Sequence, residues 1–191
     1  TVVVGPGHGG LDNGTRSSLG DEKAYALDVG LRLRDELVQR GLRVVMTREA
    51  DERREKQERA HLANEVVNAV LVSLHFNQAP TRTVQGLETY AMTPRTLKSS
   101  NDTRPGPEAP FGYAGNIREN ESLALTTAVH SSILARCGSV DRGVRRARFA
   151  VLKDCELPGV LVEGGYLSHR AEAQRVHEPQ FRAALARATA E

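Results

Sequence analysis

Short runs of β-branched and other apolar residues recur along this 191-residue chain, and segments with helical spacing separate them. The runs are continuous rather than alternating, which is typical of strands that are covered on both faces. Strands that alternate with helices favour a parallel sheet, because parallel neighbours need a crossover connection. We therefore expect a single α/β domain with a mostly parallel, twisted sheet of about six strands and helices on both faces.

The pattern also predicts where the elements lie. Apolar runs bounded by turn residues predict strands at 2–4, 42–46, 69–74, 87–92, 145–152 and 159–162. Helical spacing and end signals predict helices at 21–38, 52–68, 122–136 and 179–188. Ligands of open α/β sheets bind at the carboxyl ends of the strands, so that edge is the place to look for chemistry.

The stretch at about 93–121 has a different composition. It contains four prolines, three glycines and few apolar residues. Connections between elements are usually about 4–6 residues long, and much longer ones are often functional. We interpret this stretch as a long loop insertion.

Charge and composition exclude several classes of protein. The 26 basic and 24 acidic residues leave a net charge of +2, too small to favour nucleic-acid binding. No apolar run approaches the roughly 18 residues of a membrane span, and no basic-then-apolar leader opens the chain. The chain begins inside an expected strand, which suggests a domain cut from a longer protein. Only 4% of residues are aromatic and none is Trp, so we expect recognition through polar groups.

Three residues with metal-binding or acid/base chemistry follow separate expected strands: His8, His75 and Glu163. A single histidine in such a place is usually structural, but three such side chains should converge at one edge of the sheet. Glu22 adds a carboxylate in the first turn of the helix that leaves this edge. A glutamate there can also act only on the helix dipole, and the two roles are compatible.

Two imidazoles and one carboxylate are the ligands of a hydrolytic zinc site that keeps one position for water. Bound zinc lowers the pKa of that water to about 7, and a nearby carboxylate can take its proton. Glu163 ends a very apolar strand, where partial desolvation would make it a better base. The residues alone leave open which glutamate binds the metal and which is the base.

Six segments, in order along nearly the whole chain, resemble the zinc-dependent N-acetylmuramoyl-L-alanine amidases, the bacterial cell-wall amidase type 3 family. They are Gly7-His8-Gly9-Gly10, Asp21-Glu22-Lys23, Met46-Thr47-Arg48, Ser73-Leu74-His75-Phe76-Asn77, Gly86-Leu87-Glu88-Thr89-Tyr90 and Val162-Glu163-Gly164-Gly165-Tyr166-Leu167-Ser168. The resemblance implies one catalytic domain over residues 1–191. It also implies that His8, Glu22 and His75 bind one Zn²⁺ per chain and that Glu163 is the catalytic glutamate.

The implied reaction is hydrolysis of the amide between the lactyl group of N-acetylmuramic acid and the L-alanine of the peptidoglycan stem peptide. Its substrate implies export to the periplasm or the cell exterior. We expect a monomer, and any wall-binding domain or activator protein would come from outside this chain. The alternatives are a catalytically silent peptidoglycan-binding module and another zinc amide hydrolase, such as a peptidase or a deacetylase.

Two places depart from the family pattern. Ser168-His169 stands where many members have Ser-Asn, and we expect His169 at the surface rather than as a fourth ligand. The stretch 93–121 stands where some relatives carry a helix that blocks the active site until an activator moves it. Its prolines and glycines disfavour such a helix, so we expect a substrate-lining loop and activity without a partner protein.

Several other polar residues have less specific interpretations. Asn77 can orient a ligand or contact substrate, but it also suits a strand-ending turn. A basic stretch can contact carboxylates of the substrate, although we favour the protection of an edge strand from pairing. It consists of Arg142, Arg145, Arg146 and Arg148. Three histidines on expected helices or connections are expected at the surface: His61, His130 and His177.

Overall fold

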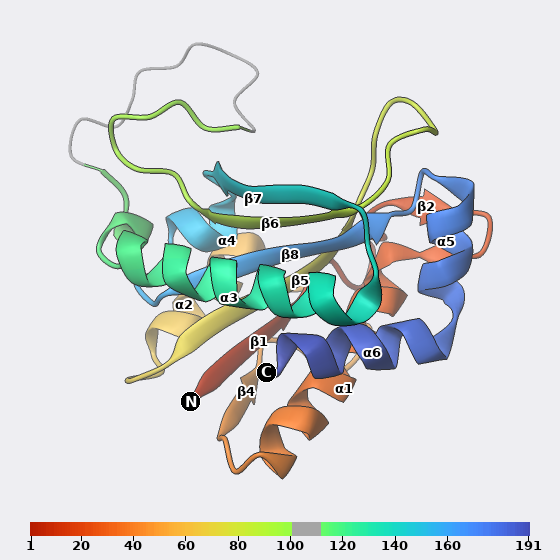
Figure 1. Ribbon diagram of the computed structural model, residues 1–191. Coiled ribbons are helices and arrows are strands. Elements are labelled where there is room, and N and C mark those ends of the chain that lie inside the picture. Colours follow the sequence, from red (N-terminus) through yellow and green to blue (C-terminus); the bar gives the residue numbers. More distant parts are fainter. Residues whose placement is uncertain (101–111) are drawn as a thin grey trace.

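The computed structural model describes residues 1–100 and 112–191 and has a six-stranded sheet at its centre (Figure 1). The strand order is β4-β1-β5-β8-β6-β7. The strands are β1 (Val2–Pro6), β4 (Val44–Met46), β5 (Val70–Asn77), β6 (Leu87–Met92), β7 (Asp141–Ala147) and β8 (Gly159–Tyr166). A short antiparallel pair, β2 (Arg16–Ser17) and β3 (Gly20–Asp21), lies outside this sheet. The expected mostly parallel six-stranded sheet is confirmed.

Helices cover both faces of the sheet, as expected. One face packs against α1 (Glu22–Gln39), α3 (Glu119–Cys137) and α6 (Pro179–Thr189). The other face packs against the shorter α2 (Lys56–Asn64) and α4 (Ala150–Lys153). Helix α5 (Arg170–His177) follows β8 and leads into α6, and a single 3₁₀ turn, η1 (Ala114–Asn116), precedes α3.

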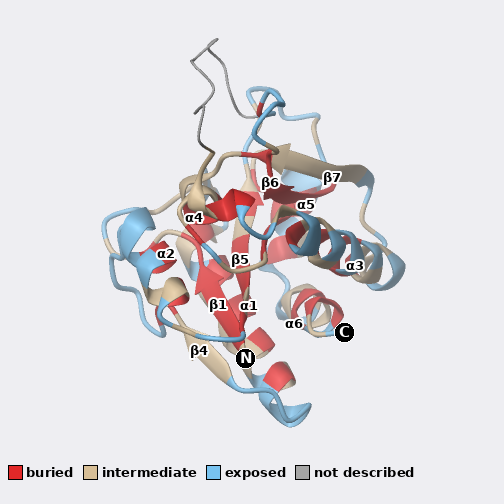
Figure 2. Ribbon diagram, turned by 90° about the vertical axis from the view of Figure 1, so that its left-hand side faces the viewer, coloured by how far each residue is buried: buried red, intermediate tan, exposed pale blue. Residues whose placement is uncertain are grey.

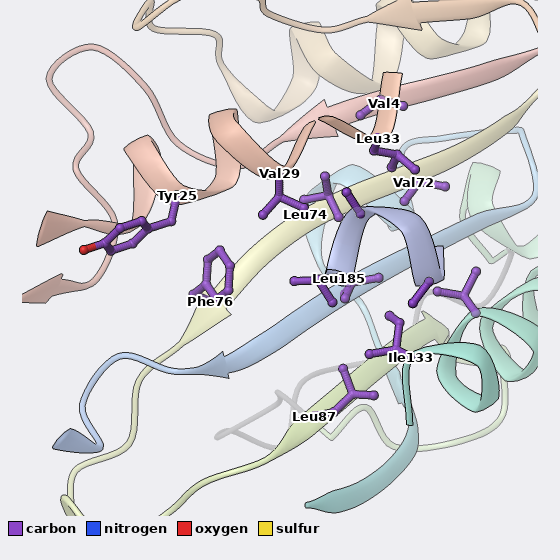
Figure 3. Close-up of a cluster of buried hydrophobic side chains, with 14 of the residues drawn as sticks. Val4, Tyr25, Val29, Leu33, Val72, Leu74, Phe76, Leu87, Ile133 and Leu185 are labelled. Carbon is purple, nitrogen blue, oxygen red and sulfur yellow. The ribbon is translucent and has the colours of Figure 1, made fainter. Parts of the chain in front are cut away.

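The strands form the centre of two apolar cores, one on each face of the sheet. Figure 2 shows the buried strands β1 and β5 in the middle of the molecule, with exposed segments around them. On the larger side, Val29 and Leu33 of α1 pack with Val72 of β5 and Leu185 of α6 (Figure 3). Because successive strand residues point to opposite faces, Leu71 of β5 belongs to the smaller core instead. Burial on both faces explains the continuous apolar runs in the sequence.

One pair of neighbouring strands breaks the parallel pattern. Within the six-stranded sheet, neighbouring strands are parallel except β6 and β8, which are antiparallel. The start of β6 therefore lies at the same edge as the carboxyl end of β8, and Glu88 comes opposite Glu163. This edge of the sheet combines the ends of some strands with the beginning of another.

Several expected elements differ from the structure. The apolar run at 145–152 is not one strand: β7 ends at Ala147, and α4 begins three residues later. The expected helix at 52–68 is shorter, because a capping box between Glu55 and Glu58 starts α2 at Lys56. Helix α5 and the pair β2–β3 were not expected. Of the expected insertion at 93–121, residues 101–111 lie outside the described ranges, and α3 begins at Glu119.

The expectation that His130 lies at the surface is wrong. Its side chain is buried, with Nδ1 3.0 Å from Thr89 Oγ1 and Nε2 3.0 Å from Asp141 Oδ1. These contacts join α3 to the edge of the sheet. Among the described helices, none combines the length and the apolar character that a membrane crossing requires.

Candidate active site

Three of the predicted side chains converge on one point at the carboxyl edge of the sheet. Glu22 Oε1 lies 3.0 Å from His8 Nε2 and 2.9 Å from His75 Nδ1. Within the described ranges, these three form the one cluster of His, Cys, Asp or Glu whose ligand atoms all lie within 4.8 Å of one another. Donors around a tetrahedral Zn²⁺ lie about 3.3 Å apart, so small shifts would let this set hold such an ion. The two imidazoles and the carboxylate therefore fit a catalytic metal site.

The loop after β1 positions His8. His8 has a left-handed backbone (φ 56°), an uncommon conformation for a residue with a side chain. Gly7 before it has no Cβ, and a Cβ there would lie 2.4 Å from the imidazole of His75. The glycine therefore lets the loop pass directly beside the second histidine.

Two buried arginines hold this loop by its carbonyl oxygens. Arg48 donates to Pro6 O (3.1 Å) and Gly7 O (2.6 Å), and Arg59 donates to Pro6 O and His8 O. Burial, together with the nearby charge of Arg59, lowers the pKa of Arg48 to about 10. The guanidinium remains charged at neutral pH and supplies hydrogen-bond donors to the loop carbonyl groups.

Glu22 begins α1, and both of its carboxylate oxygens are engaged. Oε1 accepts a hydrogen bond from the backbone N–H of Phe76 (3.1 Å), and Oε2 accepts one from that of Thr15 (2.8 Å). Burial alone raises the pKa of Glu22, but hydrogen bonds from His75 and His8 outweigh it and hold the pKa well below its usual range. This carboxylate is therefore ionised, as a metal ligand must be.

The two imidazoles have different electrostatic surroundings. Burial lowers the pKa of His75, which favours the neutral, metal-binding form. Burial also opposes protonation of His8, but Glu22 and Asp12 outweigh it and raise the pKa of His8. Asp12 Oδ2 lies 2.9 Å from His8 Nδ1, which leaves Nε2 directed at the cluster. A carboxylate on the outer nitrogen is a common way of orienting a metal-binding histidine.

Glu163 lies beside this cluster but takes no part in it. It is opposite His75 on β5 and opposite Glu88 on β6. Its Oε2 is buried and has no hydrogen-bond partner among the described residues. Burial raises the pKa of Glu163 well above its usual value, and the charges of Glu22 and Glu88 add to the shift. A carboxyl group whose pKa is raised in this way is a better proton acceptor than an exposed glutamate.

A cavity of about 400 Å³ connects these groups. His8, Glu22, His75 and Glu163 all line it, and so does Asn77. Its apolar lining includes Phe149, Val151 and Leu161. None of the described residues of 93–121 lines this cavity, so the expected substrate-lining role of that stretch is not seen in its described part.

Asn77 is fixed by a glutamate that the sequence analysis did not single out as a site residue. Asn77 Nδ2 donates to Glu88 Oε2 (3.0 Å), which also accepts from the Tyr90 hydroxyl (2.6 Å). Glu88 Oε1 lies 2.9 Å from Arg142 Nε and 3.2 Å from Arg145 Nη2. Two arginines of the basic stretch thus bind a buried carboxylate. β7 is an edge strand, as that interpretation requires, and protection of the edge from pairing stays a prediction.

His169 and several supporting residues lie around the site rather than in the cluster. His169 caps α5, and its Nδ1 accepts from the N–H of Glu172 (3.3 Å); it is not part of the cluster. Asp12, Arg48, Arg59 and Glu88 support the site but were given no role from the sequence. A buried arginine that binds carbonyl groups leaves no periodic signal, whereas the glycine-rich loop at residues 7–10 did mark the place.

Comparison with known proteins identifies the family. The chain matches the N-acetylmuramoyl-L-alanine amidase family over residues 2–191. It belongs to that family. Among solved structures, this amidase domain is similar to AmiC2 of Nostoc punctiforme, at 33% identity and a TM-score of 0.81, over 99% of this chain and 92% of that one. An N-acetylmuramoyl-L-alanine amidase from Clostridium difficile 630 is 29% identical with a TM-score of 0.83, over 99% and 91% of the two chains.

Curated relatives extend beyond this amidase domain. The amidase LytC of Bacillus subtilis is 27% identical over 188 residues, which are 98% of this chain but 34% of LytC. The chain therefore spans about a third of that relative. The CwlD amidase of Clostridioides difficile, whose structure is in complex with the GerS lipoprotein, shares the fold at 23% identity with a TM-score of 0.75, over 98% of this chain and 93% of that one.

Proposed function

We propose that this chain hydrolyses the amide bond between N-acetylmuramic acid and the L-alanine of the stem peptide in peptidoglycan, in a zinc-dependent reaction. Membership of the amidase family supports the substrate class. The observation that carries the chemistry is the convergence of His8, Glu22 and His75 beside a buried carboxyl group, Glu163, that no described residue hydrogen-bonds at Oε2.

The surroundings of the two glutamates support different roles for them. Glu22 has both oxygens committed to the histidines and to backbone N–H groups, and its pKa is depressed. Glu163 has a buried oxygen without a described partner and a raised pKa. We assign Glu22 as a ligand together with His8 and His75, and Glu163 as the general base.

Zinc bound by the three ligands would polarise the scissile carbonyl and make water nucleophilic near neutral pH. Glu163 takes a proton from the attacking water and returns one to the nitrogen of the leaving L-alanine, so that one carboxyl group serves twice. Asn77, held by Glu88, lines the cavity and contacts the substrate there.

We further propose that the protein is exported, because its substrate lies outside the cytoplasm, and that this domain is monomeric. We also propose that wall targeting depends on segments other than this amidase domain. We expect activity without a partner, because the described residues of 93–121 leave the cavity open. Strict dependence of purified protein on an activator would contradict this.

Digestion of purified peptidoglycan tests the proposal. Mass spectrometry of the products should find stem peptides with a free L-alanine amine and unmodified glycan strands. Cuts within the peptide would instead indicate a peptidase, loss of acetyl groups a deacetylase, and binding without products a silent module. Any of these results would overturn the proposed reaction.

Substitutions separate the ligands from the base. Glu163→Gln should lower kcat at least a thousandfold while about one zinc per chain remains, and His75→Ala should lose the metal. Glu156→Gln, at an exposed glutamate, is the matched control. Loss of zinc from Glu163→Gln would show that the ligand and base roles are assigned wrongly.

A further inference from the structure

A second cavity, of about 610 Å³, lies next to the one that holds the candidate metal site. Its walls come from three parts of the chain: the β2–β3 hairpin, the loop after β5, and the beginning of α5. The Tyr25 hydroxyl donates to Leu19 O (2.8 Å) and holds the hairpin. Ala79 N–H donates to Ser168 Oγ (3.0 Å) and joins the loop to the segment before α5. These hydrogen bonds fix the walls on both sides.

Two chain segments run from the first cavity into the second. Gly14 and Thr15 line the metal-site cavity, and the next residues, 16–19, line the second one. Asn77 lines the first cavity, Gln78 lines both, and residues 79–80 line the second. The two cavities therefore adjoin along both segments and share Gln78, so a substrate bound at the metal site can reach from one into the other.

The second cavity has a single sign of charge. Each of its three walls contributes one exposed arginine: Arg16, Arg82 and Arg170. None of the described residues that line it is acidic. Within the described ranges these arginines make one ion pair, between Arg16 Nε and Asp21 Oδ1. It is long at 3.9 Å and well exposed, so it neutralises little of the charge. Three guanidinium groups around one cavity favour an anionic ligand, such as a carboxylate.

We propose that this arginine-lined cavity binds the free carboxylates of the peptidoglycan stem peptide, on the far side of the scissile bond from the sugar. The inference rests on the proposed function, because that function puts a peptide into the adjoining cavities. The stem peptide is the part of the substrate that carries several carboxylates, whereas the glycan backbone is much less charged. The cavity thus selects the peptide end of the substrate and orients the bond over the metal site.

Binding of a free stem tetrapeptide to the zinc-loaded protein tests the proposal without turnover. Two peptides of the same sequence are compared by calorimetry, one with free carboxylates and one with all of them amidated. The carboxylate form should bind at least tenfold more tightly to the wild type. This preference should fall to about twofold or less in the triple variant Arg16→Ser/Arg82→Ser/Arg170→Ser. Arg43→Ser, at an exposed arginine just before β4 and outside both cavities, should keep the preference.

Equal binding of both peptides by the wild type would overturn the proposal, as would a preference that survives in the triple variant. Hydrolysis of the corresponding muramoyl tetrapeptides is measured in parallel, and the lost preference should appear there mainly in KM. Failure to hydrolyse either muramoyl peptide would contradict the proposed function, while the binding comparison would still decide on the arginine-lined cavity.

Discussion

Glu88 lies directly opposite Glu163 on the neighbouring antiparallel strand, and His75 lies opposite Glu163 on the other side. The three residues form one row across β6, β8 and β5, on the face of the sheet covered by α2 and α4. Glu88 keeps its charge because Tyr90, Arg142 and Arg145 surround it. A fixed negative charge beside Glu163 helps that carboxyl group hold a proton.

Replacing Glu88 by Gln should lower stability in a pH-dependent way. Burial alone raises the pKa of Glu88, but hydrogen bonds from Tyr90 and Arg142 outweigh it and lower the pKa. A depressed folded-state pKa contributes stability above the unfolded pKa of about 4.3, and this stability is lost as the pH falls through the folded value. We expect Glu88→Gln to cost about 1.5–3 kcal/mol at pH 7.

Urea denaturation at several pH values measures this effect. The difference between the wild type and Glu88→Gln should narrow below about pH 4.3. The control, Glu49→Gln, removes an exposed partner of Arg34 and should change stability much less. A difference that stays constant down to pH 3 would contradict the role of the ionised Glu88.

Gly7→Ala should weaken metal binding without changing a ligand. The new Cβ would lie 2.4 Å from Cε1 of His75, so the imidazole must move. We expect a loss of zinc affinity of about tenfold or more, comparable to the loss of a group that orients a ligand. Gly5→Ala is the matched control, since its Cβ would be 3.6 Å from the nearest atom. Equal zinc retention by both variants in competition with a chelator would contradict this account.

Arg48→Lys should release the loop that carries His8. The guanidinium also donates to Ala50 O (3.0 Å) and Lys23 O (2.8 Å), so it joins four carbonyl groups that lie in different directions. A lysine ammonium cannot reproduce this fork. We expect a loss of about 2–3 kcal/mol of stability from the unpaired buried groups, together with weaker zinc binding. Urea denaturation measures the stability, and competition with a chelator measures the zinc affinity. Arg32→Lys, at a partly exposed pair with Asp28, should change neither by much. An Arg48→Lys variant that matches it in both would contradict this role of Arg48.

The two cysteines should differ in reactivity. Burial raises the pKa of Cys155 to about 11, and its side chain is only 1% exposed, whereas Cys137 is partly exposed. At pH 8 only about one Cys155 in a thousand would be a thiolate, even if reagents could reach it. Iodoacetamide should therefore modify Cys137 first and Cys155 only in urea, as peptide mass spectrometry can measure. Similar rates for both thiols in the native protein would contradict this.

The sequence predicted the sheet and the central chemistry because both leave local signals. Buried strands are continuous apolar runs, and the glycine-rich loop at residues 7–10 marks a place where the backbone turns sharply beside other groups. Parallel strands bring their carboxyl ends together, so the convergence of His8 and His75 follows from the fold class. The boundaries were less accurate: His75 and Glu163 lie inside β5 and β8 rather than after them.

The supporting residues could not be predicted because their roles depend on contacts between distant segments. Arg59 lies on a helix whose charge pattern predicts a solvent-exposed face. Its side chain nevertheless binds the loop that carries His8, more than 50 positions earlier in the chain. The spacing around His130 is typical of a helical surface residue, and its burial depends on the packing of α3 against β6 and β7. The run at 145–152 has a strand-like composition, but Phe149 starts a helical turn that covers the sheet instead of extending it.

The position of β8 limits the order in which the sheet can assemble. It is the last strand in the chain, yet it lies in the middle of the sheet, between β5 and β6. During synthesis, His8, Glu22 and His75 leave the ribosome long before residue 163, and the sheet stays divided until β8 inserts. A nascent or truncated chain that ends before β8 lacks Glu163, so if Glu163 is the base, hydrolysis can begin only when the domain is nearly complete.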